Sequence, residues 1–280
     1  MALDHARWNL GIGVPCEFML LNSLARPAGS PMVDDRDVLV LHTSKGSITQ
    51  QVEKLRDFLD KNGPRGTTPI AARVQDIVQR LRTIYSDIVS SGKQLYFVLV
   101  TDGLPTAYND GVSHPNDQKE LSQSLRKLCL EYPVHLVIRL CTDDPDIADF
   151  YAKLDAELEM PLDILDDPTA ESIEFARAGN GWLSYTPFLH RLREAGTTTK
   201  LLDLLDERQL TPHETRKLVQ LLSNSPTEFP EDAGQFVAAV GQHIKQCKPV
   251  FDCRSGTMKP FVDVAGVKRA MNVSSACALL

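Results

Sequence analysis

The chain has 280 residues, of which 42% are hydrophobic and 24% charged, and its formal net charge is -7. This composition excludes a mostly disordered or fibrous chain, because such chains have too few apolar residues to build a core. The acidic balance argues against a nucleic-acid partner, since proteins that neutralise phosphates carry a basic face. The length suits one domain with a smaller companion.

The sequence predicts a cytoplasmic protein. The N-terminal residues lack an apolar run behind a basic head, so no signal peptide is expected. No stretch has the roughly 18 apolar residues that a membrane span needs. The six cysteines have no paired spacing, which favours reduced thiols.

Five short apolar runs are typical of buried strands, because they are rich in β-branched residues and bounded by turn residues. They cover residues 16–21, 37–42, 95–101, 134–141 and 161–165. Helical periodicity appears between them, over residues 48–61, 69–90, 121–128 and 147–158. This alternation predicts a three-layer α/β fold, with one mostly parallel, Rossmann-like sheet and helices on both faces. The runs 95–101 and 134–141 should be its most buried strands, since they are apolar on successive residues.

Beyond about residue 180 the pattern predicts helices alone, over residues 187–194, 199–207, 211–222 and 231–246. Thr211 and Glu214 form a capping box that marks one helix start. We therefore expect an α/β domain over residues 1–180 and a smaller helical region with a flexible tail over 181–280. Trp182 and Tyr185, near this boundary, are either a recognition patch or aromatic anchors between domains.

Two motifs carry a resemblance to a known family. Residues 66–70 read Gly-Thr-Thr-Pro-Ile, and residues 98–103 read Val-Leu-Val-Thr-Asp-Gly. In this order, with a helix between them, they resemble two motifs of the von Willebrand factor A domain, and residues 13–18 resemble its second strand. The segment 11–142 thus looks like the later two thirds of that domain. The resemblance implies a protein-binding module with a magnesium ion on the rim of the sheet, to which Thr68 would offer its hydroxyl and Asp102 its carboxylate.

The family's remaining ligands come from an Asp-x-Ser-x-Ser motif after its first strand, and this motif is absent here. Ser44 and Ser47 do not replace it, because they follow another strand and lack the aspartate. The resemblance therefore implies a degenerate or incomplete metal-ion-dependent adhesion site. No cofactor is expected for this chain, and Mg²⁺ only if the missing motif is supplied. Because the family's first strand is central, its loss should leave a gap or a rearranged pairing in the sheet.

Both candidate ligands also have a purely structural interpretation. Thr68 precedes Pro69, and a threonine before proline is a good helix N-cap with proline at the first helical position. Asp102 precedes Gly103, and an aspartate there can hydrogen-bond the backbone of a turn. The position of Asp102 at the carboxyl end of a strand still favours a binding site, since ligands of parallel sheets bind at that edge.

No catalytic motif is recognisable: a P-loop, a Gly-x-Ser-x-Gly elbow and a His-Glu-x-x-His pair are all absent. A binding protein is therefore favoured over an enzyme, and an unrecognised α/β enzyme or enzyme subunit is the alternative. His243, Cys247 and Cys253 have some zinc-like spacing but lack a fourth ligand. Cys277 is the fourth residue from the end, in a pattern that fits prenylation, and only this lipid would bring the chain to a membrane. A chance cysteine in an exposed tail is the alternative.

Overall fold

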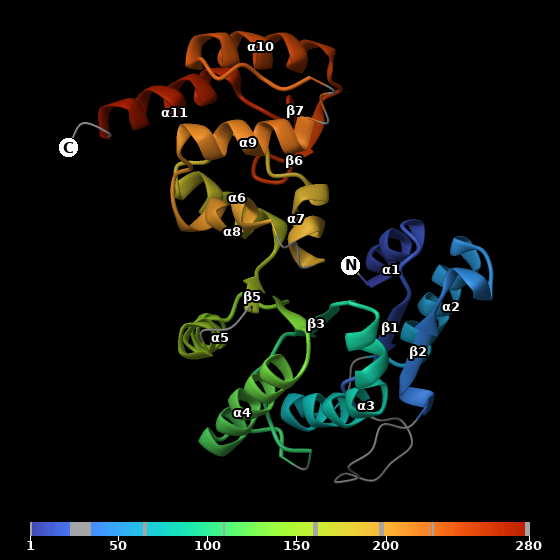
Figure 1. Cartoon of the computed structure of the whole chain (residues 1–280). Helices are drawn as coiled ribbons and strands as arrows, with labels where there is room; N and C mark the ends of the chain where they lie inside the picture. The colour runs from blue at the N-terminus through green and yellow to red at the C-terminus, as the bar shows by residue number, and fades with distance from the viewer. Residues whose placement is uncertain are drawn as a thin grey trace. The chain divides into compact units, whose positions relative to one another are not determined.

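The computed structural model describes residues 2–22, 35–63, 66–108, 110–158, 162–195, 199–223, 225 and 227–277 (Figure 1). It divides into two compact units. The first comprises Met1–Phe97, Thr101–Leu136 and Thr142–Leu162, and the second Val98–Val100, Val137–Cys141 and Asp163–Leu280. No helix within the described ranges is long and apolar enough to cross a membrane.

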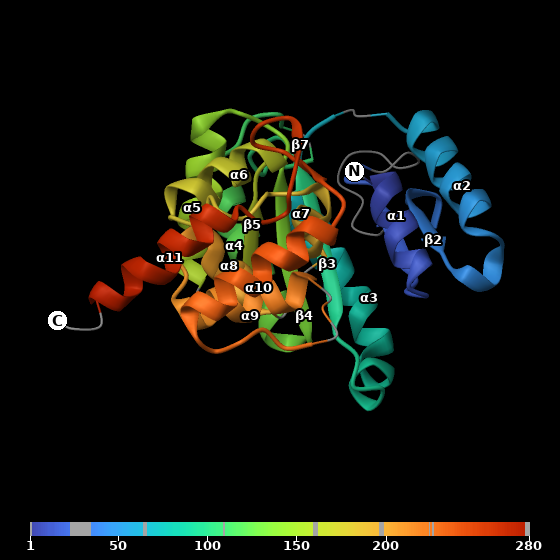
Figure 2. The same cartoon turned by 90° about the horizontal axis from the view of Figure 1, so that it is seen from above.

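The N-terminal part of the first unit is a two-stranded sheet with two helices (Figure 2). Strand β1 (Cys16–Met19) pairs antiparallel with β2 (Val38–Leu41). Helix α1 (Ala2–Gly11), which was not predicted, packs beside α2 (Ile48–Lys61). Leu10, Leu41 and Leu55 are buried in their common core, which explains why these short elements associate.

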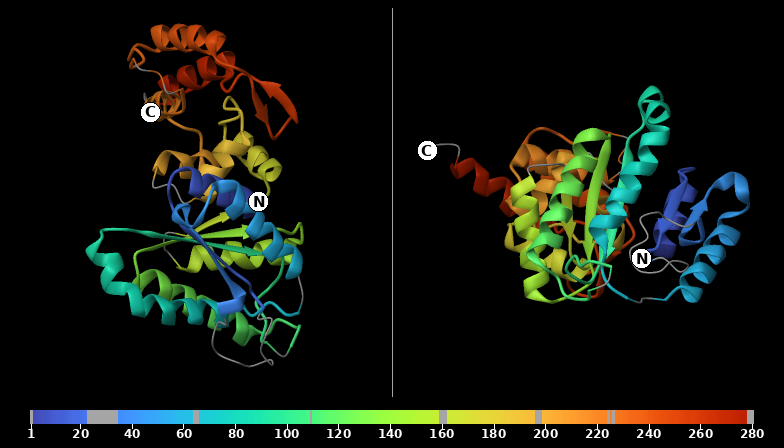
Figure 3. Two further views of the ribbon diagram at one scale, coloured as in Figure 1. Left: turned by 90° about the vertical axis from the view of Figure 1, so that its right-hand side faces the viewer. Right: turned by 90° about the horizontal axis from the view of Figure 1, so that it is seen from below.

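A second sheet has the strand order β3-β4-β5 and is parallel (Figure 3). Its strands are β3 (Leu95–Thr101), β4 (Val134–Leu140) and β5 (Leu162–Leu165). Helix α3 (Ile70–Ser90) leads into β3, and α4 (Pro115–Glu131) and α5 (Pro145–Leu158) connect the strands. Parallel neighbours need such crossovers, so the general α/β class predicted from the sequence is confirmed.

The prediction of one five-stranded sheet is wrong, because β1 and β2 form a sheet separate from β3-β4-β5. The expected burial of β3 is also wrong. Tyr96 and Val100 on β3 are 47% and 44% exposed, whereas every residue of β4 is buried as predicted. The reason is position: β4 lies between two strands, while β3 pairs on one side alone among the described residues. Of the run 161–165, Pro161 lies outside the described residues.

The second unit is built mainly from six helices. They are α6 (Pro168–Arg177), α7 (Pro187–Glu194), α8 (Lys200–Glu207), α9 (Pro212–Ser223), α10 (Ala233–Gln246) and α11 (Val264–Cys277). The four helices predicted here correspond to α7, α8, α9 and α10. Trp182 and Tyr185 are buried in the core of this unit, so neither is an exposed recognition patch.

Two features of the second unit contradict the prediction of helices and a flexible tail. Strands β6 (Val250–Asp252) and β7 (Thr257–Lys259) form a hairpin, whose turn Gly256 closes with a φ of 64°. Helix α11 continues to Cys277, because Val267, Ala270 and Met271 supply an apolar face that the core buries. The predicted exposure of the Cys277 side chain lies outside the described residues.

Candidate functional site

The loop before α3 and the loop after β3 are joined by reciprocal hydrogen bonds. The Thr68 amide donates to Thr106 Oγ1 at 2.8 Å, and the Thr106 amide donates to the Thr68 carbonyl at 2.9 Å. Thr67 Oγ1 also donates to the Tyr108 carbonyl at 3.3 Å. The two segments are about 40 residues apart in the sequence, so tertiary contacts alone bring them together.

This junction places the Thr68 hydroxyl against the Asp102-Gly103 turn. A Cβ atom added to Gly103 would lie 3.3 Å from Thr68 Oγ1, a distance that leaves little space for a side chain. Asp102, the preceding residue, is exposed, and Thr68 is half-buried. The structure therefore brings the Thr68 hydroxyl to the strand end that carries Asp102.

The Asp102-Gly103 turn is fixed by hydrogen bonds to the side chains of Thr101 and Tyr151. Thr101 Oγ1 accepts a hydrogen bond from the Gly103 amide at 3.3 Å, and the Tyr151 hydroxyl donates to the Gly103 carbonyl at 3.1 Å. Tyr151 is fully buried, and its burial raises the pKa of the phenol well above the usual value. The hydroxyl thus remains a donor, and the turn has a fixed support on α5.

A buried ion cluster underlies the Thr68 loop. Arg73 on α3 lies 3.1 Å from Asp76 and 4.0 Å from Asp37, measured between guanidinium nitrogen and carboxylate oxygen, and its Nε donates to the Leu21 carbonyl at 2.7 Å. The side chains of all three charged residues are at most 6% exposed. Asn22 Nδ2 donates to the Thr67 carbonyl at 2.7 Å. These contacts fix the loop to the chain that leaves β1.

Thr68 and Asp102 were predicted from the sequence, whereas this supporting set was not. Arg73 and Asp76 are three residues apart on α3, and Arg73 lies next to the core residue Val74. A charged pair at helical spacing within a buried face is a signal that could have indicated them. Thr106 and Tyr151 carried no comparable sequence signal.

The N-cap interpretation of Thr68 is wrong. Helix α3 begins at Ile70, its N-cap is Pro69, and no side chain caps it. The Thr68 carbonyl accepts the Ile70 amide at 2.8 Å, so the backbone of Thr68, rather than its hydroxyl, closes the turn.

The arrangement presents hydroxyl and carboxylate oxygens, which are the ligands that hard cations such as Mg²⁺ prefer. Asp102 is the single acidic residue between Thr101 and Tyr108. A hydroxyl and one carboxylate fill few positions of an octahedron, so the site as described is far from a complete protein cage. It can still offer a hydrogen-bonding surface to another molecule.

The acidic and sulfur-bearing groups of the second unit do not supply a clear alternative metal site. Glu171, Glu174 and Asp206 are the one group of three in the described residues whose ligand atoms lie within 4.8 Å of one another. The guanidinium of Arg193 pairs with Glu171 and Asp206, so a protein cation already neutralises these two carboxylates. No such group among the described residues contains the cysteines suggested for zinc.

Comparisons with models of protein families, with curated proteins and with solved structures gave no match.

Proposed function

We propose that this chain is a protein-interaction module of von Willebrand factor A type, in which the loops around Thr68 and Asp102 meet a protein partner in the cytoplasm. The observation that carries the proposal is the contact of the Thr68 hydroxyl with the Asp102-Gly103 turn. Two motifs chosen from the sequence for one shared site thus lie side by side.

The separation of the two sheets supports the same proposal. A fold of this type that lacks its central first strand should have a gap in its sheet, and β1-β2 is indeed not paired with β3. The partly exposed Tyr96 and Val100 on β3 agree with a strand that has lost a neighbour on one side. An adhesion site without the first strand's motif would be degenerate, so the module would bind its partner without a resident metal.

The loops around Thr68 and Asp102 also have the properties of a binding surface. Asp102 is exposed, while Arg73, Asp76, Asp37 and Tyr151 beneath the loops are buried and bonded. Loops fixed in this way lose little conformational entropy on binding, which favours recognition by a preorganised surface.

Metal titration tests the degenerate-site part of the proposal. Because Mg²⁺ gives up its waters reluctantly, the full chain should bind it more weakly than about 10⁻³ M, the weak end of complete oxygen sites. Titration calorimetry with Mg²⁺ and Mn²⁺ on the wild type, Asp102→Ala and Thr68→Val measures this. Asp87→Ala is the control, since Asp87 is an exposed acid at the far end of α3. Micromolar binding that disappears in Asp102→Ala alone would refute the degenerate site.

The interaction part needs its own test. A photo-reactive residue at Asp102 should cross-link one discrete protein in cell extract, and the same residue at Asp87 should not. Asp102→Arg should abolish capture by the immobilised full chain, while Asp87→Arg should leave it unchanged. The alternative of an α/β enzyme is tested by a screen of hydrolase and transferase substrates. Turnover that is lost in the variants of Thr68 or Asp102 would establish this alternative.

A further inference from the structure

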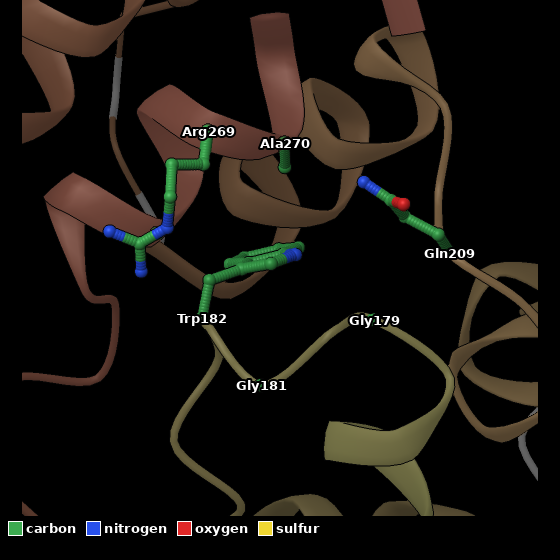
Figure 4. Close-up of a pocket in the computed structure, with 7 residues that line it drawn as sticks. Gly179, Gly181, Trp182, Gln209, Arg269 and Ala270 are labelled. Atoms are coloured by element: carbon green, nitrogen blue, oxygen red, sulfur yellow. The ribbon is translucent and has the colours of Figure 1, made fainter. Parts of the chain in front are cut away.

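A small pocket lies in the second unit, and none of its lining residues belongs to the loops around Thr68 and Asp102. Its volume is about 210 Å³, and Trp182 lines it together with Gln209, Arg269 and Ala270 (Figure 4). Gly179, Gly181 and Gly266 form the rest of its wall. Drug-sized ligands occupy about 300–1,000 Å³, so this pocket can take a single small group.

Among the residues that line the pocket, Trp182 has a buried polar atom without a hydrogen-bond partner in the described part of the chain. Trp182 is 4% exposed, and its Nε1 is buried without a hydrogen-bond partner in the described part of the chain. An indole N–H can only donate, and a buried donor without an acceptor costs about 1–3 kcal/mol. Figure 4 shows the indole between the Gly179–Gly181 segment and α11, with its nitrogen end toward the side of Gln209. The pocket therefore offers a donor that a bound acceptor would satisfy.

The glycines keep this space open. A Cβ atom at Gly266 would lie 2.7 Å from Trp182 Cβ, so no side chain fits there without moving the indole. Gly179 has a φ of 92°, and a Cβ there would lie 3.1 Å from Gln209 Cβ. Larger residues at these positions would displace Trp182 or Gln209, which both offer polar atoms to the pocket.

Arg269 is the charged residue among those that line the pocket. Its side chain is 72% exposed, and its guanidinium lies 3.6 Å from Asp263 Oδ2. The carboxylate of Asp263 also accepts the Ala265 amide on Oδ1 and the Gly266 amide on Oδ2. A single distant contact of this kind leaves guanidinium N–H groups free for another acceptor. Asp263 forms an ion pair with Arg269, and a ligand would have to share the guanidinium with it.

We propose that this pocket binds a small carboxylate, which accepts a hydrogen bond from Trp182 Nε1 and is attracted by Arg269 at the mouth. The short apolar part of the ligand would rest against the indole face and the Ala270 methyl group. The carboxylate can belong to a free small acid or to the C-terminus of a peptide, since both present the same planar anion.

The two tryptophans of the chain allow a direct test by NMR, because each contributes one indole N–H signal. The Trp8→Phe variant identifies the Trp182 signal, and Trp8 is the internal control in the wild type. Titration of the full chain with propionate should shift the Trp182 signal saturably and leave the Trp8 signal in place. The uncharged propionamide should bind more weakly. The proposal would be overturned if propionate caused no saturable shift of the Trp182 indole signal.

Charge variants separate recognition from general salt effects. Arg269→Gln should weaken propionate binding about two- to fivefold, as expected for a largely exposed charge pair. Lys268→Gln removes the same charge from the neighbouring exposed position and should have no effect. Equal binding of propionate and propionamide, unchanged in Arg269→Gln, would overturn the carboxylate assignment. The peptide acetyl-Gly-Ala, with a free or an amidated C-terminus, then distinguishes the two sources of the carboxylate. If the peptide with the free C-terminus binds more tightly than propionate, the ligand is a peptide terminus. Otherwise the ligand is a free small acid.

Discussion

Charged residues occupy interior positions in both units, and each is neutralised locally. Arg73 lies between Asp37 and Asp76 in the first unit, and Arg193 between Glu171 and Asp206 in the second. Such charges are rarely buried unless they are paired, because desolvation penalises an isolated ion strongly. These clusters fix the positions of loops and helices more than they add net stability.

Arg193 provides the clearest prediction at this scale. Arg193→Met should destabilise the protein by about 3–5 kcal/mol, because the buried Glu171 carboxylate loses its counter-charge. Burial already raises the pKa of Glu171 against the opposing effect of Arg193. Urea unfolding of the wild type and the variant measures the loss.

The double variant Arg193→Met, Glu171→Met is the matched control for this prediction. It removes both charges and retains apolar volume, so it should be more stable than the single variant. A double variant that is less stable than Arg193→Met would contradict the explanation.

The capping box at the start of α9 predicts a pH effect. Glu214 accepts hydrogen bonds from the guanidinium of Arg208 and from the Thr211 amide, and together they lower its pKa to about 2. A lowered pKa stabilises the fold above the unfolded value of 4.5, and this contribution is lost as the pH falls toward about 2. Glu214→Gln should flatten this part of the stability profile.

Thr211→Ala is the companion variant for the pH measurement. It removes the hydroxyl that accepts the Glu214 amide at 3.3 Å and should cost about 1 kcal/mol. Because Arg208 still binds Glu214, much of the acid-dependent loss should persist in this variant. Urea unfolding across the acid range tests both changes, and an unaltered profile in Glu214→Gln would assign the effect to other carboxylates.

At the level of elements, segments with similar apolar sequences are buried to different extents. Strands β3 and β4 both have seven residues and are largely apolar, yet β4 alone is buried throughout. Helix α11 shows the converse, since a stretch that was predicted to be a tail is helical once its apolar face meets a core. Packing partners decide between these outcomes, because most helical stability in proteins comes from tertiary contacts.

Two helix glycines should respond oppositely to alanine. Gly241→Ala on α10 should stabilise the protein by about 0.5–1 kcal/mol, because a Cβ there meets nothing closer than Val264 Cγ1 at 3.6 Å. Gly266→Ala on α11 should destabilise it by about 1–3 kcal/mol, because the new methyl overlaps Trp182. Thermal unfolding measures the direction of both changes in stability. A stabilising effect of Gly266→Ala would contradict the close contact between α11 and Trp182.

For the whole molecule, the core of the N-terminal part of the first unit is smaller than the core of the second unit. Among the described residues, the N-terminal core around Leu10 has five buried apolar members, whereas the core around Trp182 has seventeen. Small cores stabilise their surroundings less, because the area removed from water is smaller. Helices α1 and α2 and the sheet of β1 and β2 should therefore be a region of lower local stability.

The indole signals of Trp8 and Trp182 can follow this difference in the unmodified chain. In a urea titration by NMR, the native signal of Trp8 on α1 should disappear at a lower urea concentration than that of Trp182. Loss of both native signals at one concentration would show a single cooperative unit instead.

The sequence by itself determined the α/β class, most helix positions and the burial of β4, because periodicity and β-branched runs are local signals. It also identified Thr68 and Asp102 as members of one possible site, because the motifs at residues 66–70 and 98–103 resemble two motifs of one known family. Tertiary structure alone decided that the five runs form separate sheets, since strand pairing depends on which neighbours are present. It likewise decided the Thr106 junction, the contacts of Arg73 with Asp37 and Leu21, and the pocket at Trp182, because these join residues far apart in the chain.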